Sequence, residues 1–177
     1  MRIYELSPVV VSAEVEIEAD IETVWELLSS IDHWPEWNAD VRSATLYGAV
    51  APGSIFVWRA GPMTITSTIS QVNRPRLLAW TGRSLGIAAT HTWHMESDGE
   101  EVLVRTEESW EGPFPLLFGW LAKKLLQNSI ESWLQQLKAA AEKAALDGRP
   151  LFRASGQGDQ GRSMGKDIIR RKPPFRN

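Results

Sequence analysis

Turn-forming residues interrupt the chain at short, regular intervals between residues 41 and 111, and this spacing constrains the fold more than any other feature. The breaks are Pro52-Gly53, Gly61-Pro62, Arg74-Pro75-Arg76, Gly82 to Gly86 and Asp98-Gly99. Runs rich in β-branched and aromatic residues lie between these breaks, at 41–49, 54–60, 63–72, 77–81, 87–96 and 102–110. Short strands joined by turns this close pair as an antiparallel meander, which here has six strands.

A further strand and several helical segments flank this meander. Residues 9–18 alternate between apolar and polar side chains, which predicts a seventh strand with one wet face. Asp20 stands at the N-cap position of a helix, and Asp32 stands before a second short helix over residues 33–37. After Gly112 one long helix is predicted from Pro113 to about Ala145. Its apolar face comprises Leu117, Leu121, Leu125, Ile130, Leu134, Leu137 and Ala141.

This order of elements predicts an α+β helix-grip fold. A twisted seven-stranded antiparallel sheet curls, and the two short helices follow its first strand. A helix of roughly 30 residues spans about 45 Å, which is long enough to cross the concave face of the sheet. Bulky side chains would hold the helix away from the sheet, and the gap would become a cavity.

The charges divide the chain into two parts. Residues 1–143 carry a net charge of −8, whereas residues 144–177 carry +5. We expect a ligand-binding domain over 1–148 and a basic, disordered tail over 149–177, because the tail is rich in Gly, Ser, Arg and Lys. The tail is predicted either to contact an anionic surface weakly or only to solubilise the protein. It lacks the interleaved aromatic residues of a nucleic-acid platform.

Several classes of site do not fit the composition. The chain has no cysteine and three histidines, so disulfides and thiolate metal sites are excluded. His91 and His94 are three residues apart on a strand and face opposite ways, so we expect no metal site and no cofactor. The first eight residues do not resemble a signal peptide, and no apolar run reaches 18 residues. We therefore expect a cytoplasmic protein without a transmembrane segment.

Two short motifs match known patterns without the required context. The segment Gly82 to Gly86 has the spacing of a nucleophile elbow, but a strand is predicted after it where the elbow needs a helix. A hairpin turn is predicted there instead. Residues 156–161 have the glycine spacing of a dinucleotide-binding loop, but they lie in the basic tail and follow no strand.

Five ordered segments carry a resemblance to a known family. They are EVEIEADIETVWELLSSIDHWPEWN, PGSIFVW, ISQVNRPRLLAWTG, THTWHMESDGEEVLVRT and SWLQQLKAAAE, which together extend over residues 9–143. The chain resembles the START-like (SRPBCC) superfamily, in its polyketide cyclase/dehydrase and lipid-transport branch. The resemblance implies a helix-grip fold. Members bind lipids, sterols, plant hormones or polyketide intermediates, and some catalyse reactions without sharing catalytic residues.

Strand alternation assigns a set of side chains to the cavity. These candidate ligand-binding residues are Phe56, Trp58, Trp80, Trp93, Met95, Thr106, Glu108 and Trp110. A carboxylate inside an apolar cavity is costly unless it is paired or protonated, so Glu108 is a candidate ligand contact or general acid/base. The alternative places Glu108 in water at the open rim. His91 is a candidate base, or else a hydrogen-bonded histidine of the core or rim.

The beginning of the long helix is unusually apolar. The residues concerned are Phe114, Leu116, Leu117, Phe118, Trp120 and Leu121, and Lys123-Lys124 follow them. This segment is predicted to be a gate at the cavity mouth, a membrane-touching patch, a dimer contact, or a surface buried against Trp34, Trp37 and the hairpin loops.

The leading functional hypothesis is the binding or carriage of a small hydrophobic, lipid- or polyketide-like molecule. An alternative is an enzyme of the aromatase/cyclase or dehydratase kind, in which Glu108 or His91 moves protons. Such an enzyme needs two polar groups that converge on one point of the cavity. A third possibility is an interaction module that acts through the basic tail.

Overall fold

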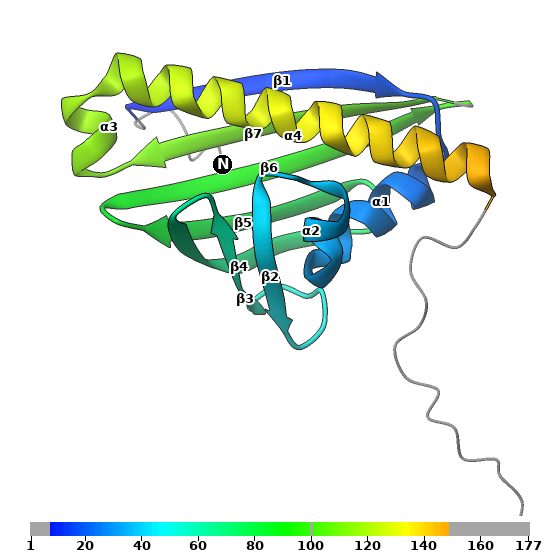
Figure 1. The fold of residues 1–177 in the computed structure, drawn as a ribbon, viewed down its shortest axis with the longest axis horizontal. Coiled ribbons are helices and arrows are strands. Elements are labelled where there is room, and N and C mark those ends of the chain that lie inside the picture. The colour runs from blue at the N-terminus through cyan, green and yellow to red at the C-terminus, as the bar shows by residue number, and fades with distance from the viewer. Residues whose placement is uncertain (1–7, 100, 149–177) are drawn as a thin grey trace, which may run out of the picture.

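Seven strands pair in the order β1-β7-β6-β5-β4-β3-β2, and every pairing is antiparallel. The computed structural model describes residues 8–99 and 101–148. The strands are β1 (Val9–Ile17), β2 (Val41–Tyr47), β3 (Ile55–Ala60), β4 (Met63–Asn73), β5 (Leu77–Ser84), β6 (Ile87–Asp98) and β7 (Glu101–Glu111). The predicted seven-stranded antiparallel sheet with its six-stranded meander is therefore confirmed, and the first strand pairs with the last (Figure 1).

The helices follow the predicted order, with one correction. They are α1 (Ile21–Ser29), the 3-10 turn η1 (Ile31–His33), α2 (Trp34–Trp37), α3 (Pro113–Leu117) and α4 (Gly119–Asp147). The prediction of one continuous helix from Pro113 is wrong, because the chain breaks at Phe118, whose φ of −125° and ψ of 42° are not helical. Gly119 follows directly and has a low helix propensity, which favours a break at this point.

The buried face of α4 differs from the predicted face in its first turns. From Ile130 onward the buried residues match the predicted face, including Leu134, Leu137 and Ala141. Before Ile130 the prediction is wrong: Ala122 and Leu126 are buried, whereas Leu125 is 47% exposed. Ala122, Leu126 and Ile130 are four residues apart and share one face of a helix, whereas the step of five residues from Leu125 to Ile130 leaves that face.

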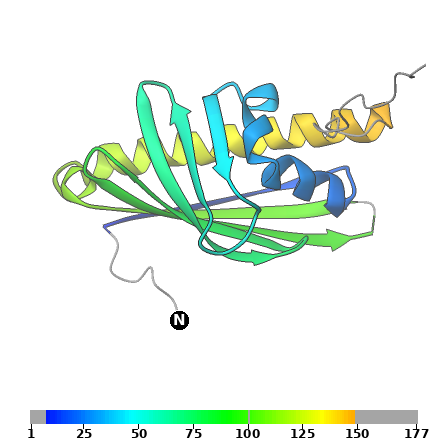
Figure 2. The ribbon, with the colours of Figure 1, turned by 90° about the horizontal axis from the view of Figure 1, so that it is seen from below.

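The sheet curls around α4, which runs beside β1 and across the concave face (Figures 1 and 2). Irregularities in pairing lie between Val41 and Ser43 in β2 and between Ile69 and Gln71 in β4. Such bulges bend a strand and increase its twist. Strands β2 to β4 accordingly turn away from the direction of β6 and β7 (Figure 2).

The turn between β5 and β6 is shorter than the sequence suggested. Strand β5 continues through Gly82 to Ser84, which pairs with Ile87, so only Leu85 and Gly86 form the turn. Both have positive φ, 33° and 80°, as in the two-residue turns that suit hairpins. A strand follows Ser84 rather than a helix, so this segment is not a nucleophile elbow. The hairpin tip packs closely on Gly112, where a Cβ atom would lie 2.2 Å from the Gly86 carbonyl oxygen.

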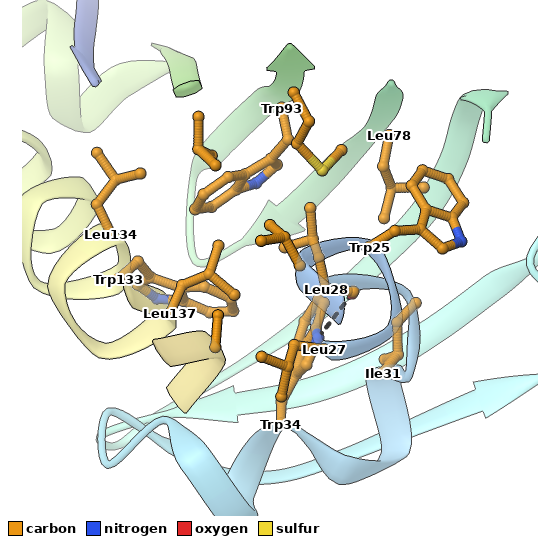
Figure 3. Packing of buried hydrophobic residues seen from close by; sticks show 14 of the residues in the cluster. Trp25, Leu27, Leu28, Ile31, Trp34, Leu78, Trp93, Trp133, Leu134 and Leu137 are labelled. Atoms are coloured by element: carbon orange, nitrogen blue, oxygen red, sulfur yellow. Dashed lines mark hydrogen bonds between the residues drawn. The ribbon is translucent and has the colours of Figure 1, made fainter. Parts of the chain in front are cut away.

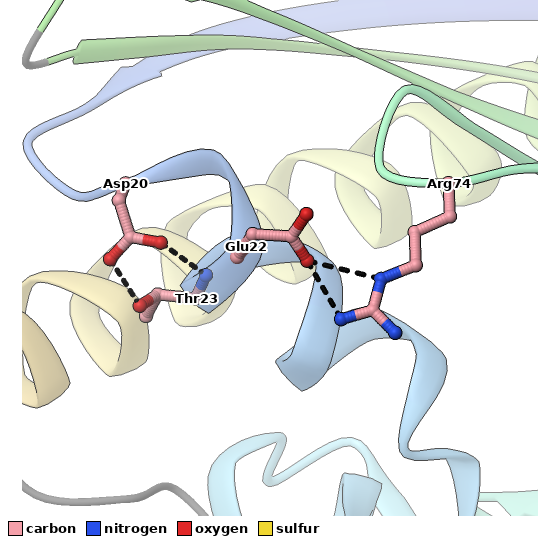
Figure 4. A network of polar contacts seen from close by, with 4 residues as sticks. All are labelled: Asp20, Glu22, Thr23 and Arg74. Atoms are coloured by element: carbon pink, nitrogen blue, oxygen red, sulfur yellow. Dashed lines mark hydrogen bonds and ion pairs between the residues drawn. The ribbon is translucent and has the colours of Figure 1, made fainter.

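Asp20 caps α1 as predicted. Its Oδ1 accepts a hydrogen bond from the Thr23 backbone N–H at 2.8 Å, and its Oδ2 accepts from the Thr23 hydroxyl at 2.6 Å (Figure 4). The Thr23 hydroxyl is the main cause of a lowered pKa of Asp20. Glu22 in the same first turn pairs with Arg74, which follows β4, at 2.8 Å. These contacts set where the helix begins and tie it to the sheet.

Trp34 lies at the centre of the main hydrophobic core and is fully buried (Figure 3). Its ring centroid lies 5.0 to 5.8 Å from those of four other aromatic side chains, namely Phe56, Trp58, Trp80 and Trp133. Its indole N–H donates to the Leu28 carbonyl at 3.0 Å, so its polar atom is satisfied. This residue therefore joins α1, the sheet and α4 in one cluster.

Residues 149–177, predicted as a basic disordered tail, lie outside the described residues, and so does the proposed contact of this tail with an anionic surface. Deletion of residues 150–177 is expected to leave a cooperatively folded domain, because the tail contributes little apolar surface. The check is a thermal melt of the shortened chain beside the full chain. A large loss of Tm would show that the tail packs on the domain.

None of the described helices is both long enough and apolar enough to cross a membrane.

Candidate functional site

A cavity of about 280 Å³ lies between the inner face of strands β3 to β7 and the N-terminal half of α4. Its aromatic walls are Trp58, Trp80, Trp110 and Trp133. The remaining lining residues are Ala60, Met63, Ile65, Ser67, Gly82, Arg83, Ser84, Ile87, Ala89, His91, Glu108, Leu125 and Ser129.

Small side chains create the space. Gly82 and Ala89 are cross-strand partners, and Ala89 also pairs with Trp110, so two minimal side chains lie side by side on the cavity floor. A Cβ atom at Gly82 would come within 3.1 Å of the Ser67 Oγ, which shows how closely the chain fits around this floor. The cavity therefore exists where alanine, serine and glycine replace the large side chains of the adjoining core.

Two titratable side chains meet inside the cavity. His91 and Glu108 are register partners on β6 and β7, and His91 Nδ1 lies 3.2 Å from Glu108 Oε2. The other carboxyl oxygen, Oε1, accepts a hydrogen bond from the Trp110 indole N–H at 2.8 Å. His91 Nε2 lies 2.7 Å from the Thr106 hydroxyl, which in turn lies 3.3 Å from the Thr92 carbonyl oxygen. A continuous series of polar contacts thus runs from Trp110 to Thr92.

The surroundings favour the neutral form of each group of this pair. The side chains of His91 and Glu108 are only 7% and 14% exposed. The His91 ring packs between two indoles, with centroids 4.8 Å from Trp80 and 5.1 Å from Trp93. Burial lowers the pKa of His91 to about 3 and raises the pKa of Glu108 to about 7, with the Trp110 hydrogen bond opposing the second change.

The cavity brings together five of the nine residues that the sequence proposed for the site. Trp58, Trp80, His91, Glu108 and Trp110 line it. Glu108 faces the interior and is paired, so the alternative of a fully solvated Glu108 at the rim is wrong. His91 is a buried, hydrogen-bonded histidine that also lines the cavity.

The other four proposed residues lie elsewhere in the interior. Phe56, Trp93, Met95 and Thr106 are all fully buried and do not belong to the cavity lining. Phe56 and Trp93 fill the core beside Trp34 and His91, and Thr106 supports the His91 ring through its hydroxyl. Alternation predicted that these side chains point inward, and they do. The inner face of the sheet extends beyond the cavity, so an inward side chain can also lie in the solid core.

The sequence reasoning missed the small residues and the contribution of the helix. Ala60, Gly82 and Ala89 stand two positions from Trp58, Trp80 and His91, so the same alternation would have included them. Large side chains mark the walls of a cavity, whereas its empty volume lies beside small residues, which the prediction did not consider. Ser129 and Trp133 on α4 were not predicted to line the cavity, because the predicted apolar face of the helix did not include them.

The apolar segment around the α3–α4 break is exposed. Exposure reaches 74% for Leu116, 73% for Leu117, 50% for Phe118 and 77% for Trp120. Trp34 instead packs on residues of the sheet and on Trp133. The prediction that this segment is buried against Trp34 is therefore wrong for these four residues, which all belong to the described part of the chain. Leu125, which is also exposed, belongs both to this surface and to the cavity lining.

The raised pKa of Glu108 predicts a pH-dependent stability difference between the natural chain and Glu108→Gln. Between its ordinary value of 4.5 and about 7, the folded state holds the Glu108 proton more tightly than the unfolded state does. This contribution is complete below the lower pKa and is lost as pH rises through the upper one. The natural chain should therefore lose about 2–3 kcal/mol relative to Glu108→Gln between about pH 5 and pH 8.

Urea unfolding of both proteins at the two pH values measures this difference. His91 is present in both, so its own titration largely cancels in the comparison. If the free energies of unfolding of the two proteins change equally between the two pH values, the assignment of a raised pKa to Glu108 is contradicted.

Comparison with known proteins agrees with this architecture. A family model described as polyketide cyclase / dehydrase and lipid transport matches residues 8–142. No curated protein matches the sequence.

Solved structures show the same fold at low sequence identity. A START superfamily protein from Mycobacterium smegmatis aligns with a TM-score of 0.67 at 16% identity, covering 76% of this chain and 97% of that one. The Zhui aromatase/cyclase from a Streptomyces species aligns with a TM-score of 0.68 at 13% identity, covering 76% and 94%. A protein from Thermus thermophilus aligns with a TM-score of 0.66 at 21% identity, covering 80% and 99%. At these identities the likeness extends to the fold alone.

Proposed function

The chain belongs to the polyketide cyclase/dehydrase and lipid-transport family, and on that premise we propose that it binds a small, largely apolar molecule in the cavity under α4. The family accounts for the fold, and the site must account for the function. The observation that carries the proposal is the cavity itself, with four indole side chains in its walls and alanine and glycine on its floor.

The dimensions and chemistry of the cavity suit a compact ligand. Its volume of about 280 Å³ lies near the lower end of the usual range for small-molecule pockets. Indole walls give large apolar contact areas and favour flat or branched hydrocarbon groups. The paired carboxyl group of Glu108 supplies one polar contact that can fix the orientation of a ligand.

A neutral naphthalene derivative that absorbs at the emission wavelength of tryptophan tests this proposal. Binding should be saturable with one site per chain, and it should quench tryptophan fluorescence because four indoles line the cavity. Trp58→Ala is expected to weaken binding, whereas Trp120→Ala should leave it unchanged because Trp120 is exposed outside the cavity. Non-saturable binding, or equal effects of the two substitutions, would contradict the proposal.

A second candidate function, proton-transfer catalysis, is favoured by the convergence of His91 and Glu108. An acid/base enzyme needs a group that can take up and return a proton near neutral pH. Burial places the pKa of Glu108 at about 7, and His91 holds that carboxyl group by a direct contact of 3.2 Å. Neither feature is needed by a protein that only carries an apolar molecule.

Exchange of a carbon-bound hydrogen distinguishes the two candidates. An enolisable bicyclic ketone such as 2-tetralone is incubated with the protein in D₂O, and NMR follows deuterium entry beside the carbonyl group. An acid/base enzyme should accelerate exchange, and Glu108→Gln should reduce that rate by about 10²–10⁴-fold while the neutral naphthalene still binds. A carrier should show no acceleration and should retain its affinity in Glu108→Gln.

A further inference from the structure

The protons around Glu108 can be assigned from the hydrogen-bond partners. In one arrangement the Thr106 hydroxyl donates to the Thr92 carbonyl, His91 Nε2–H donates to Thr106, and His91 Nδ1 faces Glu108 without a proton, at 3.2 Å. In the other, the Thr106 hydroxyl donates to His91 Nε2, and His91 Nδ1 faces Glu108 with its proton. Both arrangements keep His91 neutral, as its burial requires.

The two arrangements share one consequence for a ligand. When Glu108 is ionised it has no proton to donate in either arrangement. Trp110 donates to Oε1, so the ionised carboxylate has only lone pairs left to offer. A ligand group that reaches the ionised Glu108 must therefore be a hydrogen-bond donor, whereas a carbonyl or carboxylate oxygen would find no proton there.

The rest of the cavity favours a donor that carries positive charge. The faces of indole rings attract cations, and four indoles line the same cavity as Glu108. Among the lining residues the charged or titratable groups are Glu108, His91 and Arg83, and Arg83 is exposed. The buried part of the cavity thus contains an acid and no positively charged group to neutralise it, because burial keeps His91 neutral.

We propose that the cavity binds a small organic cation, namely a primary ammonium group attached to a flat apolar body, with the ammonium on Glu108 and the body between the indoles. This proposal rests on the proposed ligand-binding function and names the chemical class of the ligand. A charge-assisted hydrogen bond combined with cation–π contact discriminates strongly against a neutral molecule of the same shape.

Binding of such a cation should depend on pH in a defined direction. The titratable group that faces Glu108 is His91 on β6; the β1 partner is Val11, and α4 contributes Leu125, Ser129 and Trp133 to the cavity. An ammonium ion stabilises the ionised carboxylate, so its affinity should rise as pH increases through about 7, the pKa of Glu108. A neutral ligand of the same shape should show no such rise.

Three isosteric probes test the ligand class on the full-length chain: 1-naphthylmethylamine, 1-naphthalenemethanol and 1-naphthoate. Isothermal titration calorimetry gives each affinity at about pH 6 and pH 8. The ammonium probe should bind at least about tenfold more tightly than the alcohol at the higher pH, and its affinity should rise by about tenfold between the two pH values. Glu108→Gln should abolish both differences and preserve alcohol binding, because its amide N–H can still donate to His91.

The matched control is Glu107→Gln, which removes the same charge from the neighbouring residue on the opposite face of β7 and should change neither difference. Equal or tighter binding of the alcohol or the naphthoate at about pH 8, or an ammonium preference that survives Glu108→Gln, would overturn the ligand class while leaving the proposed function intact. Failure of all three probes to bind folded protein would overturn the proposed function itself.

Discussion

Replacement of Trp34 by alanine is expected to lower the free energy of unfolding by about 3–5 kcal/mol. The side chain is fully buried, and its indole contacts the rings of four other aromatic residues while its N–H bonds the Leu28 carbonyl. Removal leaves a cavity among elements that cannot all move inward together, because α1, the sheet and α4 meet at this residue. Urea unfolding monitored by circular dichroism measures the loss.

The matched control is Trp120→Ala. Trp120 is 77% exposed, so its removal should change the free energy of unfolding by no more than about 0.5 kcal/mol. Similar losses in the two variants would show that Trp34 does not have the central packing role assigned to it. A small loss in Trp34→Ala alone would show that the core can collapse around the missing ring.

Filling the cavity is expected to have the largest effect on ligand binding. In Ala89→Phe the new ring projects from the cavity floor between Gly82 and Trp110 into the space that a ligand would occupy. Affinity for the neutral naphthalene probe should fall by about a hundredfold or more, since the ring and the ligand cannot share a volume of about 280 Å³. Stability should change by less than about 1.5 kcal/mol, because the ring enters existing space.

The control variant for this experiment is Ala88→Phe, which places the same ring on the opposite face of β6. It should leave probe affinity within about twofold of the natural chain, as expected for a substitution outside the cavity. Unchanged binding in Ala89→Phe would show that the probe binds elsewhere. The exposed apolar segment at the α3–α4 break would then be the alternative binding site to test. Fluorescence titration of both variants at one pH is sufficient.

Local patterns predicted much of the fold because they report local physics. The alternation over residues 9–18 identified β1, and Asp20 identified the beginning of α1 through a hydrogen bond that spans three residues. Period-two alternation also assigned the inward faces of β3, β5, β6 and β7, and all eight residues proposed to bind ligand, together with His91, lie at least partly buried. Alternation and helix capping depend only on residues that are close in the sequence, so they can be read without the tertiary structure.

The candidate site depended on contacts between distant segments. Alternation placed His91 and Glu108 inward on separate strands, but their approach to 3.2 Å follows from the register of β6 against β7. The contacts of the His91 ring with Trp80 and Trp93 and its bond to Thr106 follow from the same packing. The pKa changes of both groups are caused by burial, which belongs to the assembled sheet rather than to either strand.

The sequence by itself determined the elements, their order and the inner face of the sheet, because propensity, capping and alternation act over a few residues. The tertiary structure decided where along that face the cavity lies. Trp93 and Phe56 share the inward orientation of Trp58 and Trp80, yet they lie in solid core, because Trp133 of α4 packs on Trp93 and Trp34 packs on Phe56. Small residues open the space only near Gly82 and Ala89. A cavity is the volume that several elements fail to fill together, so its position depends on the packing of all of them.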